Sequence, residues 1–470
     1  MTKERIEQFI EKVSEILKYV YIIHIILAFC SYTADSWITG VTPLLVLGLG
    51  GIVLLYRLIH IKEYKNYPFI WLYVLFVALY GVSAIVNIRY GFMDNLKIMI
   101  WMALQFGTLY LCDINKTRDQ IYRELKRCLY VIVAATSIMN LIGVGMLFLN
   151  FCDFWTGNDG VTYLVGIAYW GRLYGVHVDP NYGAVQTIVA MVAAAFLFLK
   201  TNKNYKKVIY GLSILLNMLH LTFCGSRTGI VALMVMTVVY GFLYVFHLRK
   251  KFLPAFLLAI VCVITVLGAN KGIEEGYNAY VAFMKENDVH IGFTPDGEPS
   301  DELVEIGREE EINEDVSNRR FDLWGNALQV VATTPIFGTT FGNLVPYCME
   351  KLPECYILTN DYTVFNAFHN MFMDLLASQG IVGTLVFLTI VVLSLIYAWK
   401  SRKLLPEEDK HTCCFLFSVC AGMIVASLFV SEILYVHNQI TVLFWMMWGF
   451  LIYFFFANAR DKERKVAIGE

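Results

Sequence analysis

Long runs of apolar residues separated by short polar segments form the main pattern of this 470-residue chain. An apolar helix needs roughly 20 residues to cross the hydrocarbon core of a bilayer. Runs of about this length occur at 15–33, 37–56, 68–87, 93–112, 128–150, 182–199, 208–224, 229–247, 252–270, 370–398, 411–430 and 438–457. Because helices satisfy their own backbone hydrogen bonds in lipid, the pattern predicts an all-α polytopic membrane protein with about 12 transmembrane helices.

The distribution of Lys and Arg predicts how these helices are oriented. Most basic residues fall in every second segment between the apolar runs, including clusters at 116–127, 200–207 and 400–410. Basic residues in short loops stay on the cytoplasmic side of a membrane. We therefore expect both termini in the cytoplasm. Apolar residues at helical spacing in the polar N-terminal stretch predict that residues 1–14 belong to an amphipathic helix on the inner leaflet.

The predicted organisation is one membrane domain with a single long outer insertion. The amphipathic N-terminus is followed by spans one to nine at 15–270, a long extracytoplasmic loop at 271–369, spans ten to twelve at 370–457 and a cytoplasmic tail at 458–470. Within the loop, residues 271–368 carry 18 Asp and Glu against 6 Lys and Arg. We expect the first half of the loop, 271–318, to be solvated. Apolar residues at helical spacing in 319–331 predict a surface helix.

A second outer segment, residues 151–181, is rich in aromatic residues and weakly polar. We expect it to dip back into the bilayer as a re-entrant segment. Non-helical backbone at that depth is tolerated only where protein or a water-filled cavity covers it. The segment therefore also predicts an outward-facing cavity nearby.

Composition supports a membrane protein and narrows the range of partners. The chain is 58% hydrophobic and 16% charged, whereas ordinary soluble domains contain about 25% charged residues. A formal net charge of −2 and an acidic outer loop argue against nucleic acid as a partner. The 11 cysteines lie mostly inside spans and show no metal-ligand spacing. Cys348 and Cys355 share the outer loop, where they form either a disulfide or two free thiols.

Several cations lie on the side that is otherwise poor in basic residues. Arg172, Arg227 and Arg320 stand beside Gly, Ser or aromatic residues near the ends of spans or of the surface helix. Because arginine holds phosphate oxygens through a rigid fork of five donors, converging arginines at a membrane mouth fit a lipid-linked diphosphate. The alternative is that each one reaches lipid headgroups or a loop carboxylate. We prefer this alternative for Lys271, as for Arg89 and Lys97.

His369 and Asn370 open the tenth span directly after the long loop. A titratable imidazole at the edge of an apolar run is a candidate for proton chemistry near neutral pH. The alternative is a structural hydrogen bond between the loop and the helix. Asp374, five residues further on, either orients the imidazole or faces the same cavity.

Asp179, Pro180 and Asn181 precede the sixth span. Asp before Pro is an ordinary helix start, although Asn181 could also orient an arginine or a sugar hydroxyl. Of the isolated outer residues His177, His437 and Glu432, most are expected to be merely hydrated.

Taken together, these motifs resemble those of the O-antigen ligase and Wzy-type polysaccharide polymerase family, multi-span enzymes of the bacterial envelope. The motifs are Arg172-x-x-Gly175-x-x-x-Asp179-Pro180-Asn181, Ser226-Arg227-Thr228-Gly229, Arg320-x-x-x-Trp324 leading to Pro335-x-x-Gly338, and His369-Asn370-x9-Gly380-x-x-Gly383. Each string is weak alone, but their order on this topology is specific. The resemblance covers residues 165–400, and the first five spans add only generic hydropathy.

The resemblance implies a glycosyltransferase-C-like fold and transfer of a glycan from an undecaprenyl-diphosphate carrier to an acceptor hydroxyl. The reaction would take place on the outer face of the bacterial cytoplasmic membrane. The implied partners are the lipid-linked oligosaccharide donor and acceptor, membrane lipid, a chain-length regulator and a flippase, with no metal and no other cofactor. The residues implied are His369, Arg320 and Arg227 for catalysis, and Arg172, Arg319, Asn181, Asp179, Ser226, Asn370 and Trp324 for binding diphosphate or substrate.

The residue chemistry fits such a transfer. Arginines can neutralise the charge that develops on the leaving diphosphate, and one well-placed donor in a water-poor site contributes about 3–4 kcal/mol. His369 would take the acceptor proton, and in-line attack would invert the anomeric centre. The first interpretation is a polymerase of lipid-linked repeat units, and the closest alternative is a ligase that moves a finished glycan to another acceptor. A transporter is a third alternative, but its substrate site would be expected near the midplane of the membrane.

Overall fold

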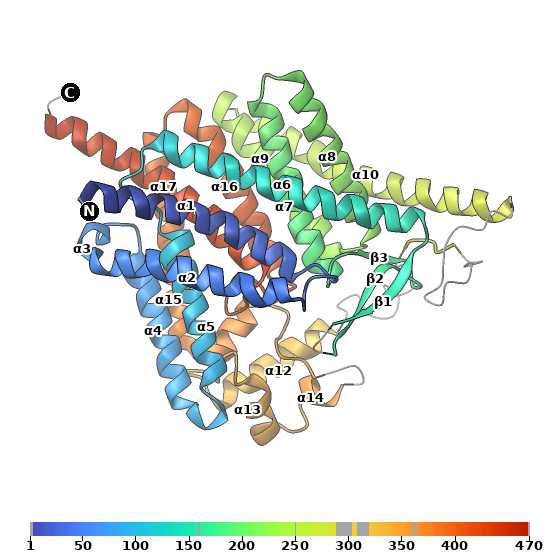
Figure 1. Cartoon of the computed structure of the whole chain (residues 1–470), viewed down its shortest axis with the longest axis horizontal. Helices are drawn as coiled ribbons and strands as arrows, with labels where there is room; N and C mark the ends of the chain where they lie inside the picture. Colours follow the sequence, from blue (N-terminus) through green and yellow to red (C-terminus); the bar gives the residue numbers. More distant parts are fainter. Residues whose placement is uncertain are drawn as a thin grey trace.

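The structure of the protein is a computed structural model that describes residues 3–157, 160–249, 251–287, 303–307, 319–360 and 364–468. Helices account for most of these residues (Figure 1). They are α1 Lys3–Ala28, α2 Trp37–Ile59, α3 Ile61–Tyr64, α4 Ile70–Val86, α5 Met93–Leu104, α6 Arg118–Phe148, α7 Pro180–Lys200, α8 Asn204–Phe223, α9 Arg227–Arg249, α10 Phe252–Glu286, α12 Arg320–Thr333, α13 Leu344–Lys351, α14 Tyr356–Thr359, α15 Met371–Ser401, α16 Glu407–Ala426 and α17 Gln439–Ile468.

Eight helices of the described chain are long and apolar enough to cross a membrane, which confirms a polytopic membrane protein. They are α2, α6, α7, α9, α10, α15, α16 and α17. The other four predicted spans fall on α1, α4, α5 and α8, so the count of twelve spans stays a prediction. Figure 1 shows both ends of the chain at the same end of the molecule. The predicted amphipathic N-terminus and first span form one continuous helix, α1.

The core is organised around α17. Almost every side chain from Ile440 to Phe455 is buried, and α17 packs against α1, α6, α7, α15 and α16. A helix that is apolar on all sides must be surrounded by other elements. Because α17 is enclosed in this way, it holds the segment before it, residues 427–438, against the rest of the bundle.

Residues 152–175 form a small antiparallel sheet; the segment was expected to be non-helical, but the all-α prediction did not include these strands. The strands β1 (Cys152–Thr156), β2 (Thr162–Ala168) and β3 (Arg172–Gly175) pair in the order β1-β2-β3. Their β-branched and aromatic residues favour strands, and the turn residues at 157–160 favour a hairpin. The sequence prediction did not include these strands, because it was based on the hydropathy of the segment. Whether the sheet enters the bilayer stays a prediction.

The outer loop is more ordered at its start than its acidic composition predicts. Helix α10 continues past residue 270 to Glu286 and projects from the bundle in Figure 1. Tyr277 and Val281 on this extension form a buried cluster with Leu303 and Ile306. Most residues of 271–286 are exposed, as expected for a solvated stretch, but they form a helix with one face covered by these apolar contacts. The acidic run at 308–311 lies outside the described residues. Cys348 and Cys355 are buried free thiols.

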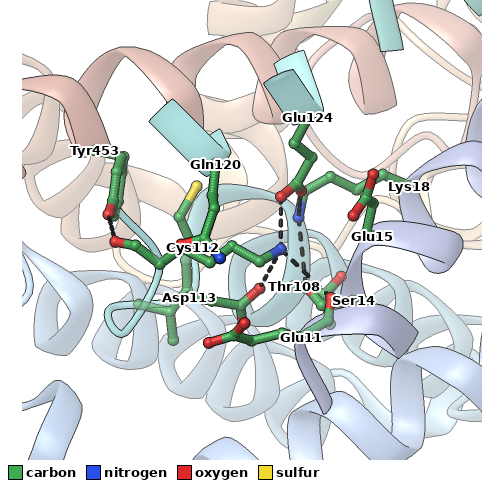
Figure 2. A network of polar contacts seen from close by, with 12 residues as sticks. Glu11, Ser14, Glu15, Lys18, Thr108, Cys112, Asp113, Gln120, Glu124 and Tyr453 are labelled. Atoms are coloured by element: carbon green, nitrogen blue, oxygen red, sulfur yellow. Dashed lines mark hydrogen bonds and ion pairs between the residues drawn. The ribbon is translucent and has the colours of Figure 1, made fainter. Parts of the chain in front are cut away.

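A network of five buried charges lies on the predicted cytoplasmic side. Figure 2 shows Lys18, Asp113 and Glu124 in this network. The Glu124 carboxylate lies 2.7 Å from the Lys18 ammonium group and 2.6 Å from the Lys116 ammonium group. The Lys116 ammonium group also lies 3.2 Å from the Asp113 carboxylate. Arg57 pairs with Asp113. The network joins α1, α2, α6 and the 105–116 segment, so it acts as an ionic clamp within the bundle.

The segment that meets Arg57 has an unusual backbone. Residues Gln105–Tyr110 form a π-helical turn, which redirects backbone carbonyls. The Arg57 guanidinium donates to Gly107 O at 2.7 Å and to Leu111 O at 2.6 Å. The turn therefore supplies acceptors that a buried arginine requires.

Candidate active site

The first group of site residues is a chain of polar contacts where β3, α7 and α9 meet. Arg172 is buried, and its guanidinium donates to Asn181 Oδ1 at 2.7 Å and to Cys224 O at 2.8 Å. Ser226 Oγ donates to the same Asn181 oxygen at 3.2 Å. Asn181 therefore orients an arginine, as one of the two alternatives predicted. Ser226 also caps α9, since Gly229 N donates to its hydroxyl at 3.2 Å.

Asp179 caps α7 with its side chain. Its carboxylate accepts the backbone N–H of Asn181 at 2.7 Å and of Tyr182 at 3.1 Å. Pro180 follows at the first helical position, which is the ordinary arrangement of a helix start. Asp179 is half-buried, and its charge acts on residues of other elements, as described below.

The turn that carries His369 is strained and held by two side chains. His369 has φ of 51°, a left-handed conformation that non-glycine residues rarely adopt. Asn370 caps α15 by accepting from Phe372 N at 2.9 Å, and Asp374 accepts the Phe368 N–H at 2.8 Å. Asp374 thus fixes the backbone before His369. The imidazole meets the Phe365 ring edge-on at 5.6 Å and hydrogen-bonds to no described residue.

Arg320 approaches from the start of α12. Its Nε donates to Phe429 O at 3.1 Å, and the guanidinium lies 5.6 Å from the centre of the Phe429 ring. Two neighbouring candidates are placed differently. Arg319 is exposed, and Trp324 is half-buried against Phe321 with an indole N–H that has no acceptor in the described chain.

Charged side chains from two other elements act on the pKa of His369. Burial lowers the pKa of His369, the Arg320 guanidinium lowers this pKa further, and the Asp179 carboxylate opposes both effects. The charges of Arg320 and Asp179, which come from two other parts of the chain, therefore act on His369. Since its pKa is lowered, the imidazole is neutral at pH 7 and can accept a proton.

Comparison with known proteins bears on the family that the chain resembles. Residues 210–388 match the family model described as O-antigen ligase, Wzy_C. The predicted family resemblance is confirmed. The matched segment contains Arg227, Arg320 and His369, whereas Arg172 and Asp179 lie before it. An uncharacterized protein of Haemophilus influenzae is 23% identical over 231 residues, which are 48% of this chain and 51% of that protein. The match thus spans about half the length of this relative.

The family's description points to a glycan-processing membrane enzyme of the bacterial envelope. Several residues of the family motifs have a packing explanation in this structure. Gly380 has φ of 61° and kinks α15, and a Cβ there would lie 2.4 Å from Ile336 O. Ile381 N donates to Pro335 O at 2.8 Å, and Thr339 N donates to Ala377 O at 2.9 Å. The kink therefore locks the end of the α12 segment onto α15, close to the turn with His369.

The segment between α16 and α17 adds a residue that the sequence analysis did not select. Glu432 was expected to be hydrated, but it is fully buried and neither carboxylate oxygen has a hydrogen-bond donor in the described chain. Burial, and then the Asp179 carboxylate, raise its pKa. Ile433 and Tyr435 beside it have φ of 75° and 62°. Buried orphan groups and strain of this kind are concentrated at functional sites, so Glu432 joins the candidate site.

The expectations for His177 and His437 are also wrong. His177 is buried and pairs with Asn140 Oδ1 at 2.9 Å. His437 stacks on Trp101 with ring centres 3.7 Å apart. The residues that surround these two histidines come from helices distant in the sequence. The sequence next to each histidine therefore does not reveal its burial.

Arg227 lies beside the group rather than among its contacts. It is the first residue of α9 and lines a separate cleft with Ser226 and Gly171. Asn370 faces its own helix as a cap. The predicted residues therefore divide into a central group around His369, a cleft with Arg227, and residues that support the backbone.

Proposed function

We propose that the protein is a polysaccharide polymerase that joins undecaprenyl-diphosphate-linked oligosaccharide repeat units into capsule or O-antigen-type polysaccharide. The reaction would take place at the outer face of the cytoplasmic membrane, with both termini inside and without a metal ion. The observation that carries this proposal is the half-buried His369 imidazole, which hydrogen-bonds to no residue in the described part of the chain and lies under the influence of the Arg320 charge.

In the proposed step, the acceptor hydroxyl oxygen attacks the anomeric carbon of the donor and transfers its proton to His369. The bond between that carbon and the diphosphate oxygen breaks, and the electron pair leaves with the diphosphate. Arg320 and Arg172 stabilise the resulting charge, because guanidinium groups bind phosphate oxygens bidentately. Attack from the opposite side inverts the anomeric configuration.

A ligase that transfers a finished glycan to a lipid-core or wall acceptor is a second candidate, favoured because the matched family is described as O-antigen ligase. The two candidates share the donor and differ in the acceptor. The catalytic group proposed here serves either one.

The test is incubation of the purified full-length protein with a defined undecaprenyl-diphosphate oligosaccharide, followed by sizing of the products. A polymerase yields a ladder of repeat units on the carrier. A ladder that requires a separate acceptor lipid, or a single transfer onto it, would favour the ligase. No new glycosidic bond with either acceptor would contradict the proposal.

A further inference from the structure

An apolar cavity of about 530 Å³ lies between α9, α15, α16 and α17, at the ends of these helices that are predicted to be cytoplasmic. Its walls are mostly aliphatic and aromatic, and they include Phe246, Leu395, Phe417 and Phe455. Phe246 and Leu395 are exposed on helices that are long and apolar enough to cross a membrane. In a bilayer the cavity is therefore open to lipid.

The depth of the cavity matches one leaflet of a membrane. Leu395 stands seven residues before Arg402, and seven residues correspond to about 10 Å along a helix. Half of the hydrocarbon core of a bilayer is about 15 Å deep. An acyl chain that enters beside Arg402 would therefore meet apolar walls over most of its leaflet.

The charged residues that line the cavity are all basic. They are Lys400, Arg402 and Lys410, and no carboxylate lines the cavity in the described part of the chain. Lys410 forms an ion pair with Glu407. Lys400 and Arg402 are exposed and form no ion pair with a described residue, although the Arg402 guanidinium lies against the Trp399 ring.

The acidic residues that begin α16 are paired with other cations. Glu407 pairs with Lys410 and interacts with a further group. The carboxylates of Glu408 and Asp409 lie 2.7 and 3.5 Å from the Arg118 guanidinium. The two basic side chains at the edge of the cavity therefore keep a positive charge that no described carboxylate compensates, and such a charge attracts an anion.

We propose that this cavity binds an anionic phospholipid, with its phosphate group at Lys400 and Arg402 and an acyl chain between α15 and α16. Basic pockets between membrane helices suit acidic headgroups, and each Lys or Arg near the surface strengthens the attraction. The walls accept an apolar chain and place all of the charge at one end, as in such a lipid. Because the cavity lies at the opposite end of α15 from His369, the inference does not depend on the proposed function.

The first test is native mass spectrometry of the purified full-length protein, titrated with dioleoylphosphatidylglycerol in a mild detergent. Lys400→Ala/Arg402→Ala should raise the dissociation constant of the most tightly bound lipid about 25-fold, since each basic residue near a membrane surface contributes about fivefold. The matched control is Lys62→Ala/Lys65→Ala, which removes two exposed lysines that do not line the cavity and should leave this constant unchanged. An unchanged constant in the first variant, or an equal rise in the control, would overturn the proposal.

The second test separates the contributions of headgroup and chain. Dioleoylphosphatidylcholine has no net charge, so the wild type should bind it about as weakly as Lys400→Ala/Arg402→Ala binds the anionic lipid. Cys414→Phe places a ring at a half-buried position of the cavity wall and should weaken binding of both lipids. Equal affinity of the wild type for the two lipids, or unchanged binding by Cys414→Phe, would contradict the proposed site.

A longer lipid is tested by competition. A second apolar cavity of about 310 Å³ shares Leu395 and Phe417 with the first and continues along α15 to Met371. A polyprenyl monophosphate should displace dioleoylphosphatidylglycerol from the wild type only when it is in excess. Displacement at less than equimolar concentration would assign the cavity to a polyprenyl lipid and overturn the phospholipid site.

Discussion

At the scale of single residues, the most informative groups are those whose surroundings contradict their sequence context. His369 is held in a left-handed turn, and Glu432 is buried with no hydrogen-bond donor among the described residues. The Asp179 carboxylate acts to raise the pKa of both side chains. The sequence could indicate His369 because it opens an apolar run after the longest polar segment. It could not indicate Glu432, whose burial depends on how α17 is packed.

Replacement of Glu432 by Gln should change how stability depends on pH. Because the folded-state pKa of Glu432 is raised above its unfolded value, the folded protein binds the proton more tightly, and stability falls as pH rises above about 4.5. Glu432→Gln removes this loss. The difference in melting temperature between variant and wild type should therefore become more positive from pH 5 to pH 8, measured by thermal unfolding in detergent. A difference that becomes more negative with pH would mean that Glu432 is stabilised as a charged group.

At the scale of elements, the kink in α15 joins this helix to the segment that follows α12. Motif strings such as Pro335-x-x-Gly338 and Gly380-x-x-Gly383 were predicted from the family resemblance, but their physical role became visible only with the backbone contacts. The carbonyls of Pro335 and Ala377 accept hydrogen bonds across the kink. Hydropathy predicted α15 correctly as a span, but a left-handed glycine within a helix leaves no periodic signal. The sheet at 152–175 was missed for a similar reason, since its short strands lie within an aromatic segment.

Gly380→Ala should destabilise the protein, because its backbone conformation (φ 61°, ψ −162°) is essentially restricted to glycine and costs another residue roughly 1–3 kcal/mol, and because the added Cβ meets Ile336 O. The control is Gly276→Ala on α10, where a Cβ would meet nothing within 4 Å. Alanine there should stabilise the helix by about 0.5–1 kcal/mol. Thermal unfolding of the two variants should therefore move in opposite directions. Equal shifts would show that the kink is not strained against α12.

At the scale of the whole molecule, the polar groups separate into two ends. The buried ionic network on the predicted cytoplasmic side joins α1, α2 and α6, while the candidate active site joins β3, α7, α12 and α15 at the other end. The orientation rule places the basic cluster at 116–127 on the inner side, but it does not predict that Lys116, Arg57 and Lys18 are buried. Charge counting places residues on a side of the membrane and does not reveal which of them pair within the protein.

Lys116→Met should destabilise the protein strongly, because it leaves Glu124 and Asp113 with fewer cations in a buried site. Breaking a buried ion pair by removing one partner typically costs about 3–5 kcal/mol. Adding Glu124→Gln to the variant should recover part of this loss, since the uncompensated carboxylate is also removed. Lys97→Met, at an exposed pair with Asp94, should have little effect. If Lys116→Met also melts like the wild type, the network does not act as a clamp.

The central claim is that His369, placed next to Arg320, accepts the acceptor proton during glycan transfer. The most direct measurement is the pH dependence of kcat/KM for transfer from a defined lipid-linked donor by the wild type, Arg320→Gln and Arg320→Lys. Because Arg320 lowers the pKa of His369, loss of its charge should move the acidic limb of the profile to higher pH in Arg320→Gln, while Arg320→Lys keeps the limb of the wild type. An acidic limb that stays in place in Arg320→Gln, or that persists in His369→Ala, would contradict the account.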